Sequence, residues 1–169
     1  MTLIAATTDR RVVIMSADSG CSHSNGLISR TGEPKIWQAG ELLIGASGTV
    51  RACQVAQHKL VVPALLDDLH AYFVTAFWDA LAPLIAKDDH LELLIGVRGQ
   101  LFHVHPGGSV TSDPSAPYAA IGCAAQVALG ALFAGAPLEL AMQAAERHCL
   151  DIRGPFITFT SPQTLASAP

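Results

Sequence analysis

"TLIAATTDRRVVIMSADSG", residues 2 to 20, decides the fold that we expect for this chain. Two apolar, β-prone runs (2–8 and 11–18) flank Asp9 and Arg10, a pattern typical of a β-hairpin. Because antiparallel arms of similar length bring their outer ends together, Thr2 and Asp18 are expected at the same end of the hairpin.

The remaining sequence alternates between strand and helix patterns. Further strands are expected over 35–40, 41–48, 90–97, 100–106, 108–113 and 154–161, with a small one at Leu27-Ile28. Helices are expected over 49–62, over 65–87, from about Gly122 to 135 and over 137–150. This order predicts sheets with helices outside them in one domain, 1–169, because neither a linker nor a repeat interrupts it.

Composition excludes several classes of protein. Half of the residues are hydrophobic, only 14% are charged and the mean hydropathy is +0.38. This composition indicates either an unusually large core or, as the favoured interpretation, an apolar surface covered by other subunits. No apolar run approaches the ~20 residues of a membrane span, and no secretory signal opens the chain. The net charge of −4 and the scattered basic residues argue against nucleic acid as a partner. Four cysteines without CxxC spacing predict free thiols and a cytoplasmic location.

Thr2 has a chemical use if Met1 is removed. An N-terminal threonine carries a hydroxyl and an amine with a pKa of about 8, and the amine can accept the hydroxyl proton. Such a site needs a cation near the amine and a carboxylate to hold that cation, roles that Lys35 and Asp18 could fill. Hairpin geometry makes such a meeting possible, whereas composition alone favours Asp18 as a turn residue and Lys35 as a solvated strand start.

The chain resembles the proteasome β-type subunits and the bacterial peptidase HslV. Residues 2–20 resemble their mature N-terminus, where the active-site aspartate follows the nucleophilic threonine by 16 residues, as Asp18 follows Thr2. The resemblance continues through four further stretches: "EPKIW" (33–37), "LIGASGTV" (43–50), "AAIGCAAQVALGAL" (119–132) and "CLDIRGPFITFTS" (149–161).

The resemblance implies an α+β fold, the four-layer α-β-β-α sandwich of N-terminal-nucleophile hydrolases. It also implies hexameric or heptameric rings stacked face to face, polypeptide substrates and a separate ATP-dependent unfoldase as a partner. No organic cofactor is implied, but a monovalent cation such as sodium is, at the backbone carbonyls of Gly154, Ile157 and Thr160. An ordinary strand is the alternative interpretation of those three residues.

The same resemblance assigns the catalytic roles. Thr2 is the nucleophile of a threonine-type peptidase, Lys35 lowers the pKa of its amine, and Asp18 holds Lys35. Backbone N–H groups of Ser47 and Gly48, in a turn over 45–48, form the oxyanion hole. Removal of Met1 by an aminopeptidase is expected, without a propeptide.

The resemblance implies two further catalytic residues, and it also reveals several departures from the family pattern. Cys123 replaces a serine that orients the amine and a water, and Asp151 matches an aspartate of HslV. Ser47 stands where glycine is expected, and the interval from Asp18 to Lys35 is one residue longer than usual. These departures leave two alternatives open: a catalytically silent ring-forming scaffold or binding protein of the same fold, and a small-molecule amidase.

Three histidines are further candidates for a functional role. His103 and His105 alternate on one expected strand and point the same way, but no third metal ligand is evident from the sequence, which favours a structural pair. His23 is interpreted as a solvated loop residue, with a place in a substrate cleft as the alternative.

Overall fold

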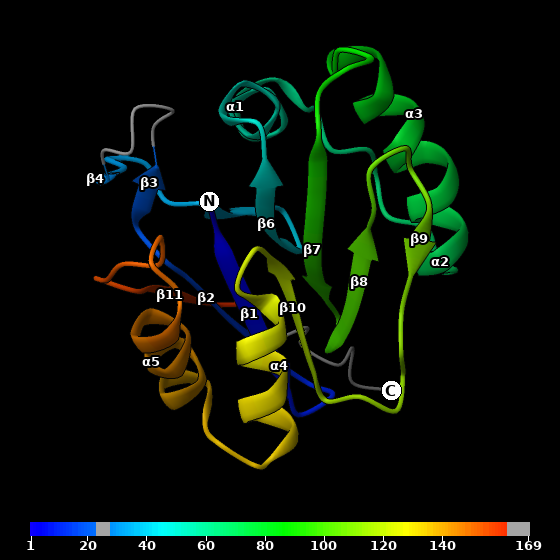
Figure 1. Ribbon diagram of the computed structural model, residues 1–169. Coiled ribbons are helices and arrows are strands. Elements are labelled where there is room, and N and C mark those ends of the chain that lie inside the picture. Colours follow the sequence, from blue (N-terminus) through cyan, green and yellow to red (C-terminus); the bar gives the residue numbers. More distant parts are fainter. Residues whose placement is uncertain (23–27, 162–169) are drawn as a thin grey trace.

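The N-terminal hairpin lies at the centre of a four-stranded antiparallel sheet (Figure 1). The computed structural model describes residues 1–22 and 28–161. In it, β1 (Leu3–Thr8) pairs with β2 (Val13–Ala17), and Ile4 lies opposite Ala17. Strand β10 (Tyr118–Gly122) borders β1, and β11 (Ile157–Thr160) borders β2. The hairpin prediction is therefore confirmed.

A second sheet faces the first. It contains five antiparallel strands in chain order: β5 (Ile36–Ala39), β6 (Leu42–Gly48), β7 (Leu91–Val97), β8 (Gln100–Val104) and β9 (Val110–Thr111). The chain passes from the first sheet to the second through a small hairpin of β3 (Gly20–Ser22) and β4 (Ile28–Arg30).

Helices cover the outer face of each sheet (Figure 1). The second sheet carries α1 (Val50–Lys59) and a helical segment made of α2 (Leu69–Tyr72), the π-helical turn η1 (Phe73–Phe77), α3 (Trp78–Leu81) and the 3₁₀ turn η2 (Ala82–Leu84). The first sheet carries α4 (Ala125–Phe133) and α5 (Leu138–His148). Glu139 in the first turn of α5 and Arg147 in its last turn complement the helix dipole, as expected.

The hydrophobic core has three layers: one between the two sheets, and one between each sheet and the helices that cover it. The middle layer lies between the sheets and includes Ile4, Met15, Ile36, Leu43 and Leu94, all fully buried. The two outer layers join each sheet to its helices. The α-β-β-α sandwich is thus the observed architecture.

Three local predictions differ from the structure. Strand β10 was not expected, because its residues "YAAIG" lack the alternation of a half-buried strand; pairing with β1 imposes the extended conformation. Strand β3 lies in a segment expected to be a loop. The helix expected over 65–87 begins only at Leu69, because the Asp68 side chain accepts the N–H of Ala71 and caps it there.

The small strand expected at Leu27-Ile28 is observed from Ile28 onward, and Leu27 lies outside the described residues. Within the described ranges, no helix combines the length and apolar character that crossing a membrane requires.

Truncation of Met15 tests the middle core layer. Met15→Ala is expected to lower the free energy of unfolding by about 2–5 kcal/mol, because the fully buried side chain leaves a cavity between the sheets. The neighbouring Ile14 is 41% exposed on the same strand, so Ile14→Thr is a matched control that should cost under about 1 kcal/mol. Urea unfolding followed by circular dichroism measures both, and equal losses would contradict the layer assignment.

Candidate active site

The Asp18 carboxylate organises one end of the first sheet. Its Oδ1 accepts the N–H of Leu3 at 2.8 Å and its Oδ2 accepts the N–H of Gly20 at 2.9 Å. The hairpin brings these groups together, since Asp18 itself donates its N–H to the Leu3 carbonyl at 3.1 Å. The carboxylate is thus buried at the outer end of the hairpin, where the sequence placed it.

Lys35 completes this arrangement from the second sheet. Its Nζ lies 2.7 Å from Asp18 Oδ1, and it also donates to the carbonyls of Gly20 at 2.6 Å and Met1 at 3.1 Å. An ammonium group has three hydrogens, so all three have an acceptor. The two side chains meet although the interval from Asp18 to Lys35 is one residue longer than usual in the family.

Thr2 is held on both sides through its backbone. Its carbonyl accepts the N–H of Cys123 at 3.0 Å, and the following peptide N–H, that of Leu3, binds Asp18. Gly122 has a φ of +94°, and a Cβ there would lie 2.2 Å from the Thr2 carbonyl oxygen. Only glycine permits this close approach.

Thr2 and Lys35 border one cleft. Trp37, Val50 and Cys53 are among its other lining residues, and they give the cleft an apolar wall near Thr2. A side-chain hydroxyl, an ammonium group and an apolar pocket in one cleft form a site that can bind and attack an acyl group.

The expected oxyanion-hole residues lie at the end of β6. Residues 45–48 belong to this strand, which confirms the strand expected over 41–48. The turn that the resemblance implied over 45–48 is wrong, because regular pairing with β7 extends to Gly48. Gly48 lines the cleft, while Ser47 is buried and does not narrow it. Gly48 has a φ of +142°, and a Cβ would lie 1.9 Å from the His90 carbonyl oxygen, which excludes a larger residue.

Cys123 lies beside Thr2. Its side chain is exposed and its Sγ is 3.4 Å from the Thr2 carbonyl oxygen, a weak thiol hydrogen bond. Cys123 thus contacts Thr2 through its backbone N–H and its thiol, and its role in orienting the Thr2 amine remains a prediction.

The structure places Asp151 and the cation residues at different points of the C-terminal region. The Asp151 carbonyl lies so close to Gly20 that a Cβ there would approach it to 2.7 Å. Gly154 donates its N–H to Glu146, and Ile157 and Thr160 are the two ends of β11. Three residues of extended chain span about 10 Å, so one ion reaches both ends only if β11 bends around it. The roles of Asp151 and of this cation site remain predictions.

Two functional features were missed by sequence reasoning. The Gly20 carbonyl accepts a hydrogen bond from the Lys35 ammonium, and Glu92 accepts the N–H of Gly122 at 3.3 Å. The glycine of "DSG" (18–20) was a signal for the contact with Lys35, since a glycine lets another group approach the backbone closely. Nothing in the sequence pattern pointed to the second, and the candidate His23 lies outside the described residues.

Asp18→Asn tests the buried ion pair. The variant is expected to lower the free energy of unfolding by about 3 kcal/mol or more, because Lys35 keeps its charge and loses its counterion. The exposed pair of Glu41 and Arg98 provides the control, and Glu41→Gln should cost under about 1 kcal/mol. Chemical unfolding of both variants makes the comparison; a loss at Asp18 no larger than that at Glu41 would rule out this assignment.

Cys53 provides a pH test of the cleft. Burial raises the pKa of its thiol to about 11, although the charge of Lys35 acts in the opposite direction. The reactive thiolate is therefore scarce at pH 8, and the rate of alkylation by iodoacetamide should rise about tenfold per pH unit from pH 8 to 10. Peptide mass spectrometry measures the rate at Cys53, with circular dichroism to confirm folding at each pH. A rate that levels off near pH 8.5 would show an ordinary exposed thiol.

Comparison with known proteins gives structural matches only. No protein-family model matches the sequence, and no curated protein matches it significantly. Among solved structures, BPH of Thiobacillus denitrificans has a TM-score of 0.77 at 19% identity, covering 98% of this chain and 100% of its own. HslV of Trypanosoma brucei has a TM-score of 0.71 at 16% identity, covering 94% and 98%.

A third match is Anbu, an ancestral beta-subunit, from Yersinia bercovieri, with a TM-score of 0.68 at 18% identity over 95% of this chain and 82% of its own. These likenesses extend over nearly the whole chain and agree with the layered architecture described above. The protein therefore has the fold of HslV and Anbu.

Proposed function

We propose that this protein is a threonine-type endopeptidase in which Thr2, freed by removal of Met1, is the N-terminal nucleophile. The observation that carries the proposal is the Lys35 ammonium, held by the buried Asp18 and directed at the Met1 carbonyl. Because the oxygen and nitrogen of one peptide group are about 2.3 Å apart, the Thr2 nitrogen lies within about 5.5 Å of Nζ. The cation is therefore close enough to keep the liberated amine neutral.

The chemistry needs only this chain's own groups and water. The neutral Thr2 amine accepts the proton of the Thr2 hydroxyl as the oxygen attacks a peptide carbonyl in the cleft. The backbone N–H of Gly48 faces the developing oxyanion. The amine then gives its proton to the leaving nitrogen of the substrate, and an ester on Thr2 remains. Water, deprotonated by the same amine, hydrolyses this ester.

The proposal includes the assembly. Large apolar side chains are exposed on the isolated chain, including Phe133 and Leu150, each 82% exposed. Coverage of such residues by neighbouring subunits fits stacked hexameric or heptameric rings in the cytoplasm. A separate ATP-dependent unfoldase would supply unfolded polypeptide, and sodium at Gly154, Ile157 and Thr160 belongs to the same proposal.

Thr2→Ala and Lys35→Ala test the mechanism. Each is expected to lower hydrolysis of fluorogenic peptides by at least about 10³-fold, because the first removes the nucleophile and the second removes the charge next to its amine. Intact-mass spectrometry of the wild type should show a chain that starts at Thr2. Light scattering should show that both variants stay assembled.

Matched controls separate the site from general effects. Thr75→Ala and Lys87→Ala change the same residue types outside the cleft lining and should keep full activity. Thr2→Ser keeps the hydroxyl and should retain measurable activity. Full activity in Thr2→Ala on a chain that retains Met1 would overturn the mechanism.

The same measurements distinguish the alternatives. Assembled wild-type protein that starts at Thr2 but cleaves neither peptides nor small amides would favour the silent scaffold, which the exposed thiol at Cys123 in place of a serine suggests. Hydrolysis of small amides without cleavage of peptides would favour the amidase. Labelling by epoxomicin, the compound bound in a BPH structure, would support the peptidase if it depends on Thr2.

A further inference from the structure

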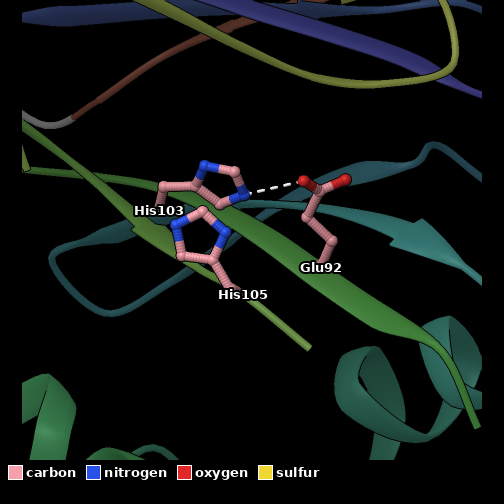
Figure 2. Close-up of side chains that lie close together, drawn as sticks. All are labelled: Glu92, His103 and His105. Carbon is pink, nitrogen blue, oxygen red and sulfur yellow. Dashed lines mark hydrogen bonds and ion pairs between the residues drawn. The ribbon is translucent and has the colours of Figure 1, made fainter. Parts of the chain in front are cut away.

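A second cluster of polar side chains lies on the second sheet, apart from the cleft. Glu92 is on β7, His103 is on the neighbouring β8, and His105 follows directly after β8. Since His103 pairs with Leu94 and side chains alternate along a strand, Glu92, His103 and His105 share one face. Figure 2 shows the three side chains converging.

The distances in this cluster suit a small cation. One ligand atom from each residue lies within 4.8 Å of the other two. His103 Nε2 is 2.7 Å from Glu92 Oε1, and the two imidazole rings stack with their centroids 3.7 Å apart. In a tetrahedral zinc site with bonds of about 2.0–2.1 Å, ligand atoms are about 3.3 Å apart. Side-chain rotations that unstack the two imidazole rings would bring the three ligand atoms to this spacing.

Neighbouring groups orient two of the three ligands. His105 Nε2 lies 2.8 Å from Thr111 Oγ1, and the imidazole can donate there, which leaves Nδ1 as the acceptor facing the cluster. Gly122 donates its N–H to Glu92 Oε2, so Oε1 remains for an ion. Partners of this kind are typical of metal-bound histidine and carboxylate groups, because they fix the tautomer and the orientation.

We propose that Glu92, His103 and His105 bind one zinc ion per chain, with water in the fourth position. Two imidazoles and one carboxylate form a ligand set that zinc accepts in proteins, with a water as the fourth ligand. The ion replaces the hydrogen bond between His103 and Glu92. It links β7, β8 and the segment that continues to Thr111, and through Glu92 it reaches Gly122, the neighbour of Cys123. The inference is independent of the proposed peptidase activity.

Metal titration of the assembled protein tests the site. After treatment with a chelator and its removal, the wild type should bind one zinc ion per chain in competition with a chromophoric chelator. It should also melt at a higher temperature with zinc than without it. Cobalt, added as a spectroscopic substitute, should give the visible absorption of a four-coordinate site without the strong near-ultraviolet band of a cobalt–thiolate bond.

Variants assign the ligands. Glu92→Gln, His103→Ala and His105→Ala should each lower zinc affinity by at least about 10²-fold, and Thr111→Val by about 10–100-fold through loss of the orienting hydroxyl. His58→Ala is the matched control, because His58 faces Glu33 at 3.5 Å in an exposed pair outside the cluster.

Two results would overturn the proposal. One is zinc affinity in His105→Ala equal to that of the wild type while circular dichroism shows a folded protein. The other is a cobalt–thiolate band, which would assign the metal to cysteine. Glu92→Gln keeps the shape of the side chain, so loss of binding there with an unchanged spectrum excludes misfolding as the cause.

Discussion

The buried Asp18 carboxylate connects the two sheets at the end where the cleft opens. It accepts two backbone N–H groups from the first sheet and its extension, at Leu3 and Gly20, and an ammonium hydrogen from Lys35 at the start of the second sheet. A buried ion pair adds little net stability, because removing both charges from water costs about as much as their attraction returns. Its effect is positional: it fixes the Lys35 ammonium next to the peptide bond between Met1 and Thr2.

The sequence predicted most accurately the segments whose structure depends on local pattern alone. Residues 2–18 form a hairpin because apolar, β-prone runs flank a polar turn, and that local pattern already places Thr2 and Asp18 together. The meeting of Asp18 with Lys35 could not be derived in this way, because it depends on how two sheets stack. The resemblance to HslV supplied that contact, and the geometry agrees with it.

What the sequence did not predict depends on pairing between distant segments. Strand β10 is alanine-rich and takes its conformation from β1, so no local signal separated it from the helix that follows. Glu92 and His103 meet only through the register of β7 with β8, and a shift of one residue would turn either side chain to the opposite face. His103 and His105 were recognised as a pair that points the same way, but their carboxylate partner is 11 residues earlier than His103 and belongs to another strand.

The three hydrogen bonds of Lys35 have a consequence for the timing of activation. In the chain that begins at Met1, every ammonium hydrogen has an acceptor, and one of these acceptors is the Met1 carbonyl. Loss of Met1 removes that carbonyl and leaves one N–H directed into the cleft, at the same step that converts the Thr2 amide into an amine. Under the proposed mechanism, a single cleavage therefore creates the base and also frees a charged donor for a water or an incoming substrate. In that mechanism the first peptide bond keeps the unprocessed chain inactive, while Asp18 and Gly20 hold the lysine in place before and after cleavage.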